Sequence, residues 1–281
     1  MTAPPDLPAR RHASLVFRDG RFEAGARAVP EEVAVAISID GSTHAVMMAS
    51  PRDLVDLGLG LALNERIVAD RSEIERIEIV ETELGFDCQI RLAPARGATY
   101  VARRRQMAGP VGCGLCGVES LELAAPPLPV LSAEMRVPPA ALVEAVAAMG
   151  RAQRLGQETR AVHAAGFFVP GEGLLVLRED VGRHNALDKV AGRLAEQGVP
   201  AAGGIVAITS RVSVELVQKC AVMGVPVLVA VSVPTALALD QADACGLTLV
   251  AVARGGEFEV FTHPRRILGA AAKDGETRDA G

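Results

Sequence analysis

The stretch of sequence that decides the fold is residues 204–231, GIVAITSRVSVELVQKCAVMGVPVLVAV. It opens with a short apolar run at residues 204–209 and closes with another at residues 227–231, both rich in β-branched side chains. Between them the apolar positions follow a helical period from Val212 to Met223. A strand, a helix and a second strand in this order are typical of a layered α/β sheet.

The same alternation extends in both directions along the chain. The remaining predicted elements are, in chain order, a helix at 140–149, strands at 165–169 and 174–177, a helix at 185–197, a helix at 236–244, a strand at 247–253 and a helix at 258–262. We therefore expect residues 126–269 to form an α/β layered domain, followed by a flexible tail at residues 270–281.

The pattern differs before the Pro-rich linker at residues 124–129. Strand-like apolar runs predominate there, and one helix at residues 51–67 has Pro51 in its first turn. The expected strands cover residues 33–39, 44–48, 74–80, 88–92 and 100–103. This mixture predicts a small α+β domain at residues 13–125, preceded by a flexible tail at residues 1–12.

Composition and charge limit the classes of function. The 281 residues include 29 Lys and Arg against 34 Asp and Glu, a net charge of -5, which argues against a general nucleic-acid binder. The longest uncharged stretch, residues 221–239, is interrupted by Pro226 and Pro234, which favours a buried strand and helix over a membrane span. Five cysteines, an odd number, without an apolar secretory segment at the start indicate a cytoplasmic protein with reduced thiols.

Two of these cysteines, Cys113 and Cys116, are the residues best suited to chemistry. They lie in a glycine-rich run, residues 112–117, and the arginines at 103–105 favour the reactive thiolate. Such a pair suits disulfide exchange, metal ligation or persulfide transfer, and a plain glycine-rich turn is the alternative. Zinc is disfavoured because a structural site needs a second pair of ligands, and Gly112 stands where the deaminase pattern has proline. We expect no metal.

Three stretches after predicted strands have residue types that suit an anion. They are Glu179–Lys189 with Arg183, Thr209–Ser213 with Ser210 and Arg211, and Arg254–Glu257. Hydroxyls, arginines and helix amides at the ends of strands are typical phosphate partners. The alternatives are a capped helix with solvated charges, a plain N-cap at Ser213 and a simple hairpin turn. His163, in an apolar strand, is by itself more typical of a core histidine.

Together, these segments resemble the formate dehydrogenase accessory sulfurtransferase family (FdhD). The matching stretches are Ala45–Leu54, Gly112–Glu119, Glu179–Lys189, Ser210–Ser213 with Gln218 and Lys219, and Phe261–Pro264. The run from Glu179 to Lys189 is the most specific of them. The resemblance implies a small α+β domain joined to a cytidine-deaminase-like α/β domain, commonly as a homodimer.

The resemblance also implies a function. Cys113 would accept a persulfide sulfur from a pyridoxal-phosphate cysteine desulfurase, with Cys116 as its partner. The sulfur would pass to the molybdenum of bis(molybdopterin guanine dinucleotide), bound as a substrate, and so activate the client formate dehydrogenase. The cofactor-binding residues would be Val252, Ala253, Arg254, Gly255, Gly256 and Glu257, to which we add Ser210, Arg211 and His163. A cofactor-binding chaperone without sulfur transfer and a dithiol oxidoreductase are the alternatives.

Overall fold

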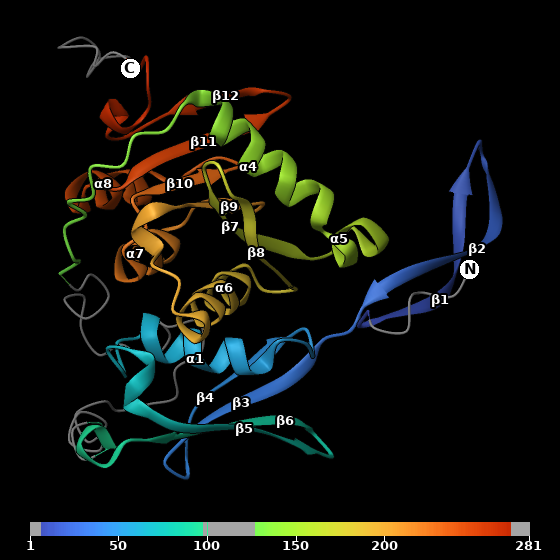
Figure 1. Cartoon of the computed structure of the whole chain (residues 1–281). Helices are drawn as coiled ribbons and strands as arrows, with labels where there is room; N and C mark the ends of the chain where they lie inside the picture. Colours follow the sequence, from blue (N-terminus) through green and yellow to red (C-terminus); the bar gives the residue numbers. More distant parts are fainter. Residues whose placement is uncertain (1–6, 98–99, 101–126, 271–281) are drawn as a thin grey trace.

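The computed structural model describes residues 7–97, Tyr100 and residues 127–270. Cys113 and Cys116 lie outside the described residues, as do residues 101–103 of the last predicted strand of the N-terminal half and the ends of both predicted tails. The described residues form a mixed α/β protein with three sheets (Figure 1).

The largest sheet has six strands, in the order β12-β11-β10-β9-β7-β8. Its strands are β7 (His163–Val169), β8 (Gly173–Asp180), β9 (Ile205–Ile208), β10 (Val227–Ala230), β11 (Thr248–Arg254) and β12 (Glu257–Val260). Strands β9, β10 and β11 are parallel, whereas β7 and β12 pair antiparallel with β9 and β11. The parallel strands β9, β10 and β11 at the centre of the sheet are therefore connected through helices, as the sequence of residues 204–231 predicts.

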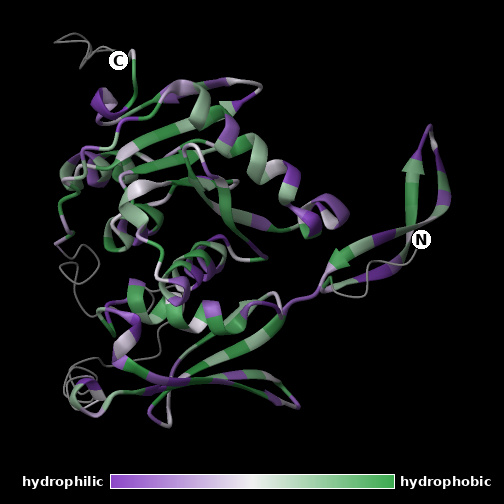
Figure 2. Ribbon diagram, viewed as in Figure 1, coloured by the Kyte–Doolittle hydropathy of each residue, from purple (hydrophilic) through white to green (hydrophobic). Residues whose placement is uncertain are grey.

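Helices cover both faces of this sheet, which explains the continuous apolar character of its central strands (Figure 2). The first face packs against α4 (Pro139–Ala152), which α5 (Arg154–Thr159) follows. The other face packs against α6 (Arg183–Gln197), α7 (Val214–Met223) and α8 (Ala236–Cys245). The predicted helices and strands of this half are confirmed, with one exception below.

The second sheet has four strands, in the order β4-β3-β6-β5. Its strands are β3 (Val33–Ile39), β4 (Ser42–Ala49), β5 (Ile74–Thr82) and β6 (Gly85–Leu92), and α1 (Leu54–Asn64) covers one face. The predicted helix at 51–67 is confirmed over its middle only, because Asp53 has a left-handed backbone that delays the start of α1.

The two sheets are joined where α1 crosses α6 (Figure 1). A Cβ atom on Gly60 would lie 1.7 Å from the backbone oxygen of Asp188, and one on Gly192 would lie 2.0 Å from that of Asp56. Only glycine allows the two helices to approach this closely. The layers are therefore the small sheet, α1, α6 with α7 and α8, the large sheet, and α4.

The third sheet is a two-stranded arm of β1 (Ala9–Arg18) and β2 (Arg21–Pro30) that projects from the body (Figure 1). The prediction of a flexible tail at residues 1–12 is therefore wrong from Ala9 onward. Asp19 and Gly20, with φ of 52° and 78°, form the turn of this hairpin. An Asp-Gly pair between alternating apolar residues is a strong hairpin signal. A two-residue turn that matches the right-handed twist of the two strands needs a positive φ at both of its residues, which Asp and Gly tolerate best.

One predicted helix is also wrong. Residues 258–262 do not form a helix, because β12 runs antiparallel to β11 after a turn at Gly255 and Gly256, both with positive φ. The uncharged stretch at 221–239 contains β10 and the start of α8, as predicted. Among the described residues, no helix is long and apolar enough to cross a membrane.

Candidate functional site

The predicted binding residues gather at one edge of the six-stranded sheet. The parallel strands β9, β10 and β11 end at this edge, and the antiparallel strand β7 begins there with His163. We call it the carboxyl edge and define it by residues 163, 209–211, 231–233 and 252–257. Two hydrogen bonds join β7 to the end of β9 at this edge. The Thr209 amide donates to the Ala164 carbonyl (3.1 Å), and the Ala164 amide donates to Thr209 Oγ1 (2.9 Å). The sheet thus brings together residues more than 90 positions apart.

Within this edge, the predicted residues differ in what they offer a ligand. His163 is half-buried opposite Asp180, and burial, followed by the charge of Arg183, lowers its pKa. Ser210 is buried and its hydroxyl donates to the backbone oxygen of Arg211 (3.0 Å), so this hydroxyl is used within its own loop. The Arg211 side chain is exposed and can reach an anion.

The predicted stretch from Val252 to Glu257 forms a bulge and a turn. Val252 has a φ of 55°, which is strained for a β-branched residue, and its amide donates to the Ser232 carbonyl (3.1 Å). Ala253 is buried, whereas Arg254 and the turn through Gly255, Gly256 and Glu257 are exposed. Arg254 Nε donates to the Val231 carbonyl (3.0 Å), which places its guanidinium at the carboxyl edge.

The starts of α6 and α7 add residues that the sequence analysis did not assign to the site. Arg183 Nε, His184 Nε2 and Glu215 Oε2 are buried atoms without a hydrogen-bond partner, and His184 Nε2 lies 3.9 Å from Glu215 Oε2. Both helices begin at the carboxyl edge, because each follows a strand that ends there. Two helix N-termini beside an arginine suit a phosphate or carboxylate. Arg183 and His184 stood in a recognised motif, but nothing local in the sequence indicated Glu215.

The other polar residues of the Glu179–Lys189 motif have structural roles. Buried Asp180 accepts hydrogen bonds from Lys189 Nζ (2.6 Å), the Gly182 amide (2.8 Å), Asn185 Nδ2 (2.9 Å) and the Ser50 amide (3.1 Å). Ser50 follows β4, so this carboxylate ties the two larger sheets together. Glu179 accepts from the amides of Leu155 and Gly156 and caps α5. These residues of the motif thus hold the edge in place, whereas Arg183 and His184 lie at the start of α6, beside that edge.

Three of the five cysteines lie among the described residues, and all three are buried free thiols: Cys88, Cys220 and Cys245. Burial raises the pKa of Cys88 to about 12 and raises the pKa of the other two. A thiol that does not ionise at neutral pH is a poor nucleophile. Among the described residues, no group of three or more His, Cys, Asp or Glu side chains is arranged to hold a metal ion.

Tyr100 and Pro127 are the described residues nearest in sequence to the two cysteines, one on each side, and both contact the layer formed by α1 and the four-stranded sheet. Tyr100 is buried in the core under α1, and its hydroxyl lies 3.0 Å from Nδ1 of His44, whose Nε2 lies 2.7 Å from Glu65 Oε2. The Pro127 carbonyl accepts from Arg66, directly after Glu65 (3.0 Å). Both attachment points therefore lie at the C-terminal end of α1.

The unusual surroundings of His184 lead to a testable pH dependence. Burial, then the charges of Arg183 and Lys219, lower its pKa to about 4, so the folded protein holds it neutral. The unfolded chain takes up this proton near pH 6.5, so the contribution of His184 to stability falls as the pH drops from about 6.5 to about 4. NMR titration of histidine-labelled protein should give a His184 midpoint near pH 4, and a midpoint near 6.5 would contradict the buried geometry.

Comparison with known proteins agrees with this architecture. The FdhD/NarQ family matches residues 30–268. The chain is 56% identical over 260 residues to the sulfur carrier protein FdhD of Agrobacterium fabrum, covering 92% of this chain and 96% of the relative. It is 52% identical to that of Brucella abortus biovar 1, covering 90% and 95%.

A solved structure is similar as well. A crystal structure from Desulfotalea psychrophila, described as a formate dehydrogenase accessory protein, has a TM-score of 0.72 and 27% sequence identity, covering 92% of this chain and 99% of the other. The sequence match spans both larger sheets and the carboxyl edge. The chain belongs to the FdhD/NarQ family.

Proposed function

We propose that this protein is a sulfur carrier that receives a persulfide sulfur on Cys113 and delivers it to the molybdenum cofactor of formate dehydrogenase. The observation that supports this most is the division of the cysteines. Cys88, Cys220 and Cys245 are buried thiols whose pKa values burial raises, which leaves Cys113 and Cys116 for chemistry. Relatives that are more than half identical bear the name sulfur carrier protein.

Loading is a thiol–persulfide exchange. The Cys113 thiolate attacks the outer sulfur of the persulfide on a cysteine desulfurase, a new S–S bond forms, and the desulfurase cysteine leaves as a thiolate. No oxidant is consumed, because the sulfur keeps its oxidation state. Cys116 assists or resolves the persulfide.

The substrate at the other end is bis(molybdopterin guanine dinucleotide), whose phosphates need positive partners. The exposed guanidiniums of Arg211 and Arg254, His163 and the N-termini of α6 and α7 supply donors at the carboxyl edge. We propose that this edge, with Val252–Glu257 and the loop amides around Ser210, binds the guanine nucleotide part. Arg183 and His184 extend the same surface.

The proposal also covers the fold class, the cellular location, the oligomeric state and the partners. The six-stranded sheet with helices on both faces supports a cytidine-deaminase-like α/β domain at residues 126–269, joined to a small α+β domain at residues 13–125. We place the protein in the cytoplasm, as a homodimer, with the cysteine desulfurase and formate dehydrogenase as partners.

Mass spectrometry tests the sulfur transfer. Incubation with a cysteine desulfurase and cysteine should add one sulfur to the peptide that contains Cys113, and Cys113→Ala should abolish both this addition and maturation of the dehydrogenase. The peptides of Cys88, Cys220 and Cys245 serve as internal controls and should stay unmodified. Full maturation with Cys113→Ala would favour the cofactor-binding chaperone, and a loss of two hydrogens without added sulfur would favour the dithiol oxidoreductase.

Nucleotide binding tests the carboxyl edge. Guanosine diphosphate, as the nucleotide part of the substrate, should bind about tenfold more weakly to Arg211→Gln and to Arg254→Gln, because each loses a charge-assisted contact with phosphate. Arg151→Gln is the control, since Arg151 pairs with Glu144 on the surface of α4. Calorimetric titration would measure this, and equal affinities for all variants would rule out the edge.

A further inference from the structure

Unsatisfied polar atoms gather at the starts of α6 and α7. Six buried side-chain nitrogen or oxygen atoms of the described residues have no hydrogen-bond partner, and four of them belong to Arg183, His184, Ser213 and Glu215. We call these four residues the edge cluster. Each of these atoms has lost contact with water without gaining a partner, which is costly for a folded protein. Their concentration in one place therefore indicates that a bound group supplies the missing hydrogen bonds.

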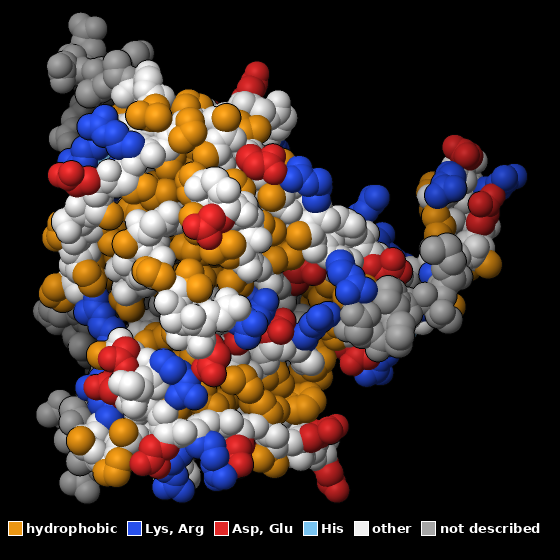
Figure 3. Space-filling model, in the orientation of Figure 1, with side chains coloured by type: hydrophobic (Ala, Val, Ile, Leu, Met, Phe, Trp, Pro, Cys, Tyr) orange, Lys and Arg blue, Asp and Glu red, His pale blue; other side chains and the backbone are white. Residues whose placement is uncertain are grey.

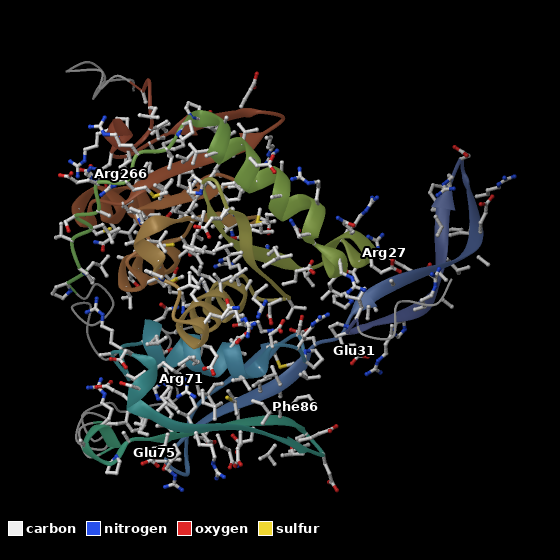
Figure 4. All side chains as sticks on the ribbon, in the orientation of Figure 1. Arg27, Glu31, Arg71, Glu75, Phe86 and Arg266 are labelled. Atoms are coloured by element: carbon white, nitrogen blue, oxygen red, sulfur yellow. The ribbon has the colours of Figure 1, made fainter. Side chains whose placement is uncertain are left out.

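The edge cluster is compact and lies close to the surface. His184 Nε2 lies 3.9 Å from Glu215 Oε2, and these side chains are 21% and 22% exposed. After burial, the charge of Arg183 is the largest influence on the pKa of His184 and of His163, and it lowers both, so Arg183 lies near both rings. Figure 4 shows Arg27 beside α5, which leads into β7 and His163, so the base of the arm marks this side of the molecule.

The charges of the edge cluster cancel, which argues against a phosphate there. Arg183 is balanced by Glu215, and His184, with a pKa of about 4, is neutral. The ammonium of the neighbouring Lys219 is bound to Asp188 at 2.6 Å. Helix N-termini attract phosphate, but the Glu215 carboxylate would repel it. Figure 3 shows a similar balance on the visible face, where positive and negative side chains lie interspersed along the seam between the two larger sheets.

The edge cluster suits a neutral ring that has hydrogen-bond donors and an acceptor side by side. A carboxylate accepts hydrogen bonds from a ring N–H and an adjacent amino group, and a guanidinium donates to a carbonyl oxygen next to them. An amino group, a ring N–H and a carbonyl oxygen in a row form the edge of a 2-amino-4-oxopyrimidine. The guanine and the pterin of the proposed substrate both have this edge. Adenine does not, because its amino group lies beside an unprotonated ring nitrogen.

We infer that Glu215 recognises the 2-amino-4-oxopyrimidine edge of the substrate, with Arg183 donating to the carbonyl oxygen of the ring. On binding, the Glu215 carboxylate turns toward the ring, which lies over His184, and the phosphates extend to Arg211 and Arg254. This inference rests on the proposed function and adds to it the residue that selects the ring.

Nucleotides that differ in the ring alone test the inference. Inosine diphosphate is guanosine diphosphate without the amino group, and adenosine diphosphate also lacks the ring N–H and the carbonyl oxygen. In calorimetric titrations of the full chain, guanosine diphosphate should bind at least about tenfold more tightly than either, because the others lose a hydrogen bond to a charged group.

Variants of two glutamates assign this preference to one side chain. Glu215→Gln keeps the shape of the side chain and one acceptor oxygen but loses the charge. It should bind guanosine diphosphate about tenfold more weakly, and its preference over inosine diphosphate should shrink to about threefold or less. Glu144→Gln changes an exposed carboxylate on α4 and should keep the wild-type affinities.

The ring signals of His184 give a local readout that a general loss of fold would not imitate. In histidine-labelled wild-type protein, guanosine diphosphate should shift the NMR signals of His184, whereas those of His12, on the arm, should stay unchanged. Free guanosine and free pterin distinguish the two sources of the ring. The compound that shifts His184 and competes with guanosine diphosphate identifies the half of the substrate that the edge cluster binds.

Three results would each overturn the inference: equal affinities for guanosine and inosine diphosphate in the wild-type protein, an undiminished preference in Glu215→Gln, or His184 signals that no ring compound shifts. These results are independent of sulfur transfer. Loading of Cys113 needs no nucleotide, so its failure in the wild-type protein would overturn the sulfur-carrier role and leave the ring preference in place.

Discussion

Replacing Gly192 by alanine should destabilise the protein severely, although the same change usually stabilises a helix. The new Cβ atom would lie 2.0 Å from the backbone oxygen of Asp56 and 2.9 Å from the backbone nitrogen of Gly60. Backbone atoms cannot move aside as a flexible side chain does, so α1 and α6 must separate. We expect a loss of about 3 kcal/mol or more in the free energy of unfolding, measured by urea denaturation.

Gly150 offers a matched control in another helix. It lies in α4, where an added Cβ would meet no atom within 4 Å. Gly150→Ala should therefore stabilise the protein by about 0.5–1 kcal/mol, through helix propensity alone. If Gly192→Ala behaved like Gly150→Ala, the two helices would not cross at the distance that the structure shows.

Replacing Lys189 by methionine should have an effect of similar size, for an electrostatic reason. Lys189 Nζ lies 2.6 Å from Asp180 Oδ2, and both side chains are fully buried. Removal of the ammonium leaves a buried carboxylate with amide donors only, which costs about 3–5 kcal/mol. Thermal and urea denaturation at neutral pH would measure this loss.

Two further variants separate charge from packing. The double variant Asp180→Asn/Lys189→Met should recover part of the stability, because no buried charge remains without its counterion. Arg151→Met, which breaks an exposed ion pair with Glu144, should change stability by less than about 1 kcal/mol. Equal effects of Lys189→Met and Arg151→Met would show that the buried pair contributes no more than a surface pair.

Most elements of the six-stranded sheet and its helices could be predicted from the sequence, because the central strands are buried on both faces. The runs around Ile205 and Val227 are continuously apolar and are separated by a helical period, so both their type and their order could be read. The arm was missed because its strands bury little, and Arg10 and Arg11 near the start of the chain suggested a solvated tail. The Asp19-Gly20 pair was the available signal.

The candidate site was predictable in part for a related reason. Residues that follow parallel strands meet at one edge whatever the details of packing, so Ser210 and Arg254 could be expected at the same edge. His163 lies there for a different reason, because it is the first residue of the antiparallel strand β7. Glu215 lies beside His184 only because α6 and α7 pack side by side, and no local pattern encodes that. The buried bonds of Asp180 likewise depend on Ser50, 130 positions earlier in the chain.

The glycine crossing has a consequence for synthesis on the ribosome. The outer face of α1 is complete once residue 64 has been made, but its cover, α6, ends only at residue 197. At a synthesis rate of about 5–20 residues per second, α6 is complete roughly 7 to 27 seconds after α1. During this interval the face of α1 around Gly60 is accessible to chaperones and to other nascent chains. Slower translation of residues 65–197 should therefore increase the fraction of the protein that is lost to aggregation.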